Sequence, residues 1–197
     1  MLNATVGKYL SVEESTAAHL ETWVEAGDYR RRQGFFRAAV MTLEAASREP
    51  HWQERDPLIW PALYNFRHFV ELSLKMLARD TPSLVPGRVP ATHELKRLWA
   101  PVRNGFELAF GAGFLEAASA IDEAVVLLHT LDPRGDGFRY ATDRKGAPSI
   151  DRDMFLDPQA LLGLFVEVER SLSAAQMAFD AHQTYIVEMH DEFDEPY

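Results

Sequence analysis

Residues 58–79 carry apolar side chains at steps of three and four, which places them on one face of an α-helix. The main stripe contains Leu63, Phe66, Val70, Leu74 and Leu77. It is widened by Phe69, Leu72 and Met76. A stripe of this width has to be covered by neighbouring elements on more than one side. The segment therefore predicts a helix at the centre of a bundle.

Other segments show the same spacing, with start and stop signals. Ser11 and Glu14 form a capping box before a helix predicted over 12–26, which Gly27 ends. Further helices are predicted over 29–48, from His93 to a kink or break that Pro101 causes near Trp99, over 114–131, and from Pro158 onward. We expect an all-α, up-and-down helical bundle in a single domain, residues 1–197. In that domain 1–27 is an N-terminal extension and 190–197 an acidic tail.

Residues 134–151 differ in character from the helical segments. Gly135 and Gly137 are typical of a turn, and the next three residues, Phe138 to Tyr140, alternate like a strand. A second turn around Gly146 would let the chain return. We therefore expect a small β-hairpin insertion near 134–151.

The composition excludes several classes of function. No cysteine is present, so disulfides, thiolate metal sites and cysteine nucleophiles are excluded. A net charge of −10 argues against a general nucleic-acid coating role but permits a local basic patch. The sequence shows neither a signal peptide nor an apolar run long enough for a membrane span, and we expect a cytoplasmic protein. Metal-ligand spacing and a phosphate-binding glycine loop are also missing, so we expect no metal and no cofactor.

Two neighbouring motifs resemble the HEPN superfamily of prokaryotic helical bundles. Residues 64–75 read YNFRHFVELSLK, with an Arg-His pair followed by Glu and Lys, and residues 93–99 read HELKRLW. The run from Leu131 to Asp143 is similar to HEPN-like proteins that carry an inserted hairpin. The resemblance covers residues 29–190.

The resemblance implies a bundle that often forms homodimers and functions around RNA. Some members are metal-independent endoribonucleases in toxin–antitoxin or antiphage defence systems. Others are catalytically silent partners of a nucleotidyltransferase, or simple binding modules.

The nuclease members carry an arginine followed, after four to six residues, by a histidine near the last helix. Arg170 and His182 do not have this spacing. Arg88 and His93 do, but they lie in a proline-rich loop before a middle helix. We therefore favour a binding or accessory role over catalysis.

A polar stripe on the central helix is the first candidate site. Tyr64, His68, Glu71 and Lys75 share one edge, flanked by Arg67. This edge is expected to lie near His93, where Arg67 and Lys75 would hold a phosphate. Alternatively, the stripe is a Glu71–Lys75 pair that only stabilises the helix.

His93 opens the next helix, where Glu94 suits the first turn. In the catalytic alternative a neutral His93 is a general base on a ribose 2′-hydroxyl, with Arg88, Arg67 and His68 in support. In the structural alternative its ring ties two helices together.

The second candidate site is the densest basic patch, formed by Arg30, Arg31, Arg32 and Arg37 on the outer face of one helix. Such a patch is suited to binding an RNA backbone or an acidic protein partner. Alternatively, the four arginines only form a solvated helix face.

The sequence thus predicts a nucleic-acid, nucleotide or protein-partner binding module. The alternatives are an endoribonuclease that uses His93 and a purely structural interaction module.

Overall fold

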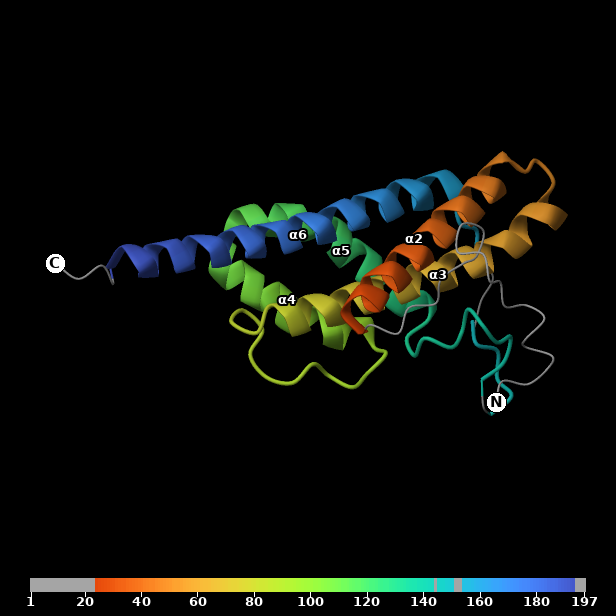
Figure 1. Cartoon of the computed structure of the whole chain (residues 1–197). Helices are drawn as coiled ribbons and strands as arrows, with labels where there is room; N and C mark the ends of the chain where they lie inside the picture. Colours follow the sequence, from red (N-terminus) through yellow and green to blue (C-terminus); the bar gives the residue numbers. More distant parts are fainter. Residues whose placement is uncertain (1–23, 144, 151–153, 194–197) are drawn as a thin grey trace, which may run out of the picture. The chain divides into compact units, whose positions relative to one another are not determined.

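The computed structural model describes residues 24–143, 145–150 and 154–193 (Figure 1). Contacts divide the chain into two compact units, residues 1–31 and residues 32–197. The bundle described below belongs to the second unit. The helix predicted over 12–26 lies, up to residue 23, outside the described residues.

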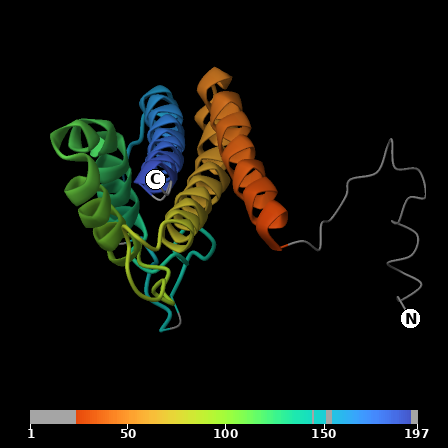
Figure 2. The same cartoon turned by 60° about the vertical axis from the view of Figure 1, so that its left-hand side comes forward.

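The described residues form an all-helical bundle without a strand. Its helices are α2 (Val24–Arg48), α3 (Trp52–Asp80), α4 (Leu95–Phe110), α5 (Ala112–Leu131) and α6 (Pro158–Phe193). α3 and α5 each contact both α4 and α6, and α6 lies between α3 and α5 in the view of Figure 2. Within the described residues no helix combines the length and the apolar character that crossing a membrane requires.

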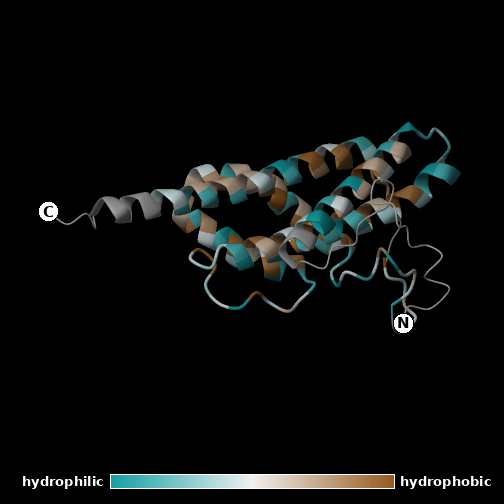
Figure 3. Cartoon of the chain, viewed as in Figure 1, coloured by the Kyte–Doolittle hydropathy of each residue, from teal (hydrophilic) through white to brown (hydrophobic). Residues whose placement is uncertain are grey.

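α3 is the central helix, as its spacing predicted. All five residues of its main stripe are buried. The ring of Phe66 stacks on Phe165 of α6 with 3.6 Å between centroids, and the ring of Phe69 lies 4.9 Å from Phe36 of α2. Burying one such side chain contributes about 1.5–3 kcal/mol. Figure 3 shows the same division along the other helices, where hydrophobic and hydrophilic residues alternate around each axis.

The start of α6 follows from local sequence. The Asp157 carboxylate accepts hydrogen bonds from the backbone N–H groups of Gln159 and Ala160, at 2.8 and 3.4 Å. Pro158 occupies the first helical position, where its missing N–H costs nothing. This cap agrees with the prediction.

The helix end predicted at Gly27 is wrong, and the helix that contains Pro101 is not broken there. α2 runs through Gly27, because one glycine costs a helix only about 1 kcal/mol. α4 begins at Leu95 rather than His93 and continues through Pro101. The proline removes one hydrogen bond, while Val102 and Phe106 beyond it are fully buried. Packing therefore outweighs the local signal in α4.

The structure does not show the hairpin predicted near 134–151. The described residues there form turns and a single antiparallel bridge between Thr142 and Pro148. The backbone N–H groups of Arg139 and Tyr140 both point to the carbonyl of Asp136, which closes a turn where a strand was expected. Proline at position 148 has no N–H to extend a ladder.

Candidate functional site

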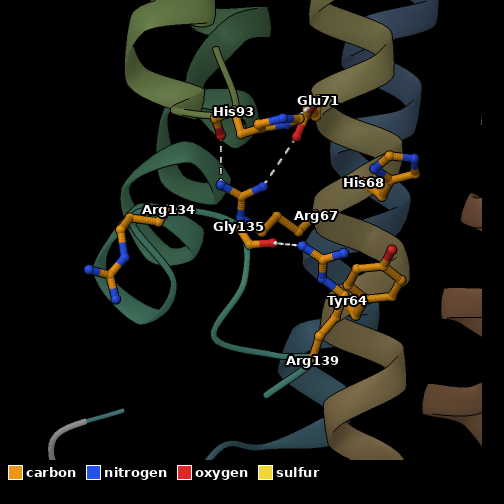
Figure 4. Close-up of a pocket in the computed structure, with 8 residues that line it drawn as sticks. All are labelled: Tyr64, Arg67, His68, Glu71, His93, Arg134, Gly135 and Arg139. Carbon is orange, nitrogen blue, oxygen red and sulfur yellow. Dashed lines mark hydrogen bonds and ion pairs between the residues drawn. The ribbon is translucent and has the colours of Figure 1, made fainter. Parts of the chain in front are cut away.

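A small cavity lies where α3, the start of α4 and the turn after α5 meet (Figure 4). We call it the Arg67 pocket, and its lining residues are Tyr64, Arg67, His68, Glu71, His93, Arg134, Gly135 and Arg139. Its volume is about 110 Å³. One water needs about 10–15 Å³, so the pocket accommodates several waters or one group the size of a phosphate.

Arg67 is the buried centre of this pocket, with 4% of its side chain exposed. Its Nη1 donates to the Glu71 carboxylate at 3.3 Å, and its Nη2 donates to the backbone carbonyl of His93 at 2.7 Å. Its Nε lies 3.3 Å from the carbonyl and 3.5 Å from the carboxylate of Asp132. A buried charge is tolerated only with such partners. One guanidinium thus joins three separate segments of the chain.

Glu71, one turn along α3, is equally buried and fully engaged. Its Oε1 lies 2.7 Å from Lys75 Nζ and 2.8 Å from His93 Nδ1. Burial acts to raise the pKa of this carboxyl, but the hydrogen bonds from Lys75 and His93 outweigh it and hold the pKa below its usual value. Glu71 is therefore ionised at neutral pH.

His93 reaches the pocket from the residues that precede α4, and 72% of its side chain is exposed. Because its partner Glu71 is a carboxylate, Nδ1 carries the proton that forms this hydrogen bond. In the neutral ring Nε2 is then the acceptor. Glu71 thus fixes both the orientation and the tautomer of the imidazole.

His68 lies on the other side of Glu71, half-buried between aromatic rings. Its ring meets Phe35 edge-on at 4.3 Å and lies parallel to Tyr64 at 6.1 Å. Burial lowers the pKa of His68; Glu71 opposes this shift, and the positive charges of Lys75 and Arg139 add to it. The imidazole of His68 is therefore neutral at neutral pH.

The turn after α5 closes the pocket opposite α3. Asp132 is 2% exposed, and its Oδ1 accepts hydrogen bonds from three successive backbone N–H groups. The donors are Gly135 at 2.8 Å, Asp136 at 3.1 Å and Gly137 at 3.0 Å. Gly135 has a positive φ of 86°, and a Cβ there would lie 2.7 Å from Arg67 Nη1. Only glycine allows the turn to approach Arg67 this closely.

Two further arginines come from this turn. The Arg139 guanidinium donates to the Gly135 carbonyl at 3.2 Å and lies 5.6 Å from the centre of the Tyr64 ring. Arg134 is exposed at the edge of the pocket, 3.7 Å from Asp136 and 3.5 Å from Asp143. Arg139 thus faces the same cavity as Arg67 and the two histidines (Figure 4).

The structure brings five of the predicted site residues together, namely Tyr64, Arg67, His68, Glu71 and His93. Lys75 supports the pocket through Glu71 without lining it. Glu94 is half-exposed beside Arg97, at 3.7 Å, and does not line the pocket. Arg88 is exposed in the loop before α4 and does not line it either.

The predicted basic patch does not form one outer face. Arg32 is 8% exposed and its guanidinium lies 5.8 Å from the ring centre of Phe69. Its position follows the helical repeat, since Arg32 precedes Phe36 and Ala39 on the inner side of α2. Arg30, Arg31 and Arg37 are exposed.

Sequence reasoning missed Asp132, Arg134, Gly135 and Arg139 as site residues. The available signal was an aspartate directly after a helix, followed by two glycines at the third and fifth positions. That pattern is typical of a carboxylate that caps a turn.

In the described part of the chain, no group of three or more histidine, aspartate or glutamate side chains is placed to hold a metal ion. No protein-family model, curated protein or solved structure matches this chain.

Proposed function

We propose that this chain is an HEPN-like protein whose Arg67 pocket binds a phosphate group of a nucleic acid or nucleotide. One observation carries the proposal: three arginines and two histidines line a single small cavity, against one carboxylate. This concentration of cationic and imidazole groups occurs in a chain of net charge −10.

The chemistry of the lining suits a phosphate oxyanion. Guanidinium groups donate in a planar fork that matches phosphate oxygens. Glu71 already accepts from Arg67, Lys75 and His93, so its charge is compensated before any ligand enters. The Arg139 guanidinium is held by Gly135 and by aromatic rings, so little side-chain entropy is lost on binding.

The HEPN resemblance supports the wider setting of this proposal. It favours a cytoplasmic homodimer that acts in a defence or toxin–antitoxin system. A nucleotidyltransferase is the protein partner that the resemblance suggests.

The proposal is tested by fluorescence anisotropy with a labelled single-stranded RNA. Arg139→Gln removes one charge from the edge of the pocket, and a charge-assisted hydrogen bond contributes about 1.5–3 kcal/mol. We expect Arg139→Gln to bind the RNA about tenfold more weakly than the wild type, or more weakly still. Inorganic phosphate is expected to compete with the RNA for the wild-type protein. Arg97→Gln is the matched control, because Arg97 is exposed on α4 and does not line the pocket. An equal loss of RNA affinity in Arg139→Gln and Arg97→Gln would contradict the proposal.

A second candidate function, a metal-independent endoribonuclease, is favoured by the Glu71–His93 pair. A carboxylate that orients an imidazole leaves Nε2 placed to take the proton of a 2′-hydroxyl. Arg67 and Arg139 would stabilise the negative charge that develops on the phosphoryl oxygens. In this reaction the 2′-oxygen attacks phosphorus, the 5′-oxygen leaves with a proton, and a 2′,3′-cyclic phosphate remains.

The endoribonuclease is tested by RNA cleavage in the presence of EDTA. We expect His93→Ala to abolish cleavage and Arg88→Ala to leave it unchanged, because Arg88 lies outside the pocket. Intact RNA after incubation with the wild-type protein removes this candidate and leaves the binding role in place.

A further inference from the structure

A second and larger cavity lies between the first half of α3 and the segment that connects α5 to α6. Its volume is about 860 Å³. Small-molecule sites in proteins span about 300–1,000 Å³ and are lined mainly by hydrophobic and aromatic side chains. We call it the Trp60 cavity, after one of the α3 residues that line it.

The Trp60 cavity has a buried floor and an aromatic rim. Leu63, Leu131 and Phe138 form the floor, where each is at most 6% exposed. Trp52 and Trp60 line the rim and are 61% and 47% exposed. Two large indole rings that face water beside a cavity of this size leave apolar surface that a ligand would remove from water.

The charges in the lining cancel. Arg55 and Asp56 are the charged residues that the described lining contains, and their side chains pair with each other at 3.1 Å. A ligand with a net charge therefore has no unpaired counter-charge in the cavity. The lining selects for an uncharged molecule, and its indole and phenyl rings favour an aromatic one, since aromatic rings attract each other in stacked and edge-on arrangements.

The Trp60 cavity is separate from the Arg67 pocket although the same segment walls both. Phe138 lines the first and its neighbour Arg139 lines the second. No residue is shared between the two linings. A test of ligand binding in the Trp60 cavity is therefore independent of a test of phosphate binding in the Arg67 pocket.

We propose that the Trp60 cavity is a binding site for an uncharged aromatic small molecule. Its volume of about 860 Å³ lies within the range of small-molecule sites, which favours a compact molecule over a protein surface as the occupant. The occupant is instead a compact molecule that fits within the cavity and excludes water from its floor.

The probe for this proposal is N-phenyl-1-naphthylamine, an uncharged aromatic dye whose emission rises in apolar surroundings. We expect saturable binding at one site per chain, and at least tenfold weaker binding in Trp60→Ala. Leu108→Ala is the matched control, since Leu108 is an 89% exposed apolar residue of α4 that does not line the cavity. It is expected to bind the dye as the wild type does. Circular dichroism of each variant checks that the fold is retained.

Two further measurements make the ligand class falsifiable. The sulfonated analogue 1-anilinonaphthalene-8-sulfonate is expected to bind several-fold more weakly, and tighter binding of this anion would overturn the neutral class. Light scattering with and without dye tests for a second copy of the chain as the occupant. A dimer that Trp60→Ala converts to a monomer, with the dye bound equally by both proteins, would overturn the proposal. Equal dye affinity in Trp60→Ala and wild type would do the same.

Discussion

At the scale of single residues, the Arg67 pocket depends on groups that serve both the fold and the site. Arg67 of α3 donates to the backbone carbonyls of His93, in the segment before α4, and of Asp132, in the turn after α5, and to Glu71 within α3. Removing one member of such a buried network leaves the others unpaired, which costs several kcal/mol. The side chain of His93 and that of Arg139, which lines the pocket outside this network, are exposed, so their replacement separates binding from folding.

Gly135→Ala tests whether the turn has to approach Arg67 as closely as the structure shows. A left-handed alanine costs about 1–2 kcal/mol in any setting, and here its Cβ would also displace the guanidinium. Gly146→Ala carries the same strain, at φ 80°, with no atom within 4 Å of the added carbon. We expect Gly135→Ala to lower the free energy of unfolding more than Gly146→Ala and to weaken RNA binding, which Gly146→Ala retains. Identical denaturation curves and affinities would show that the contact is unimportant.

Part of this site was predictable from local spacing. Tyr64, His68 and Glu71 recur at helical intervals, so any helix over 58–79 puts them on one edge. The contribution of Asp132 was not predictable in this way, because it lies 65 residues from Arg67 in the sequence and its role depends on a turn that its own carboxylate organises. Arg88 shows the reverse, since its spacing to His93 suited a known motif while its loop leaves it outside the pocket.

At the scale of elements, packing overrides local signals where the two conflict. The α3 stripe, the Asp157 cap and the helical class follow from the sequence alone. The continuous α4 does not, because Pro101 is a local break signal and the burial of Phe106 is a tertiary fact. The strand expected at 138–140 is a turn in the structure, because alternation in three residues cannot reveal where their N–H groups bond.

Gly105 of α4 lies where the loop that precedes this helix packs against it. A Cβ at Gly105 would lie 2.1 Å from the Leu84 carbonyl oxygen, a backbone atom. We expect Gly105→Ala to destabilise the protein by about 1–3 kcal/mol, as overpacking does. Gly163→Ala in α6 meets no atom within 4 Å and is expected to stabilise by about 0.5–1 kcal/mol. Urea denaturation of both variants checks the prediction, and a stabilising Gly105→Ala would refute the close approach.

At the scale of the whole molecule, the Arg67 pocket couples stability to pH. The folded pKa of His68 is lowered, so the unfolded chain takes up a proton first as the pH falls through about 6.5. The folded pKa of Glu71 is also lowered, so its stabilisation is present above about 4.3 and lost as the pH falls through the folded value. Both groups therefore make the protein less stable in acid.

This prediction is checked by urea denaturation between pH 8 and pH 3. We expect the free energy of unfolding to decline below about pH 6.5 and again below about pH 4.3. The decline in the free energy of unfolding below about pH 6.5 should be smaller in His68→Gln than in the wild type. Glu71→Gln should be less stable than wild type at pH 7, with the difference narrowing toward pH 3. A difference between Glu71→Gln and wild type that stays constant with pH would contradict the role given to this carboxylate.

The proposed binding of phosphate in the Arg67 pocket is measured through the imidazole NMR signals of the histidines during titration with inorganic phosphate at constant pH and ionic strength. Among the histidines whose side chains are described, His68 and His93 line the pocket, while His51, His129 and His182 do not. The account predicts saturable shifts of the His68 and His93 signals and stationary signals from the other three. Shifts spread evenly over all five, or none at His93, would contradict it.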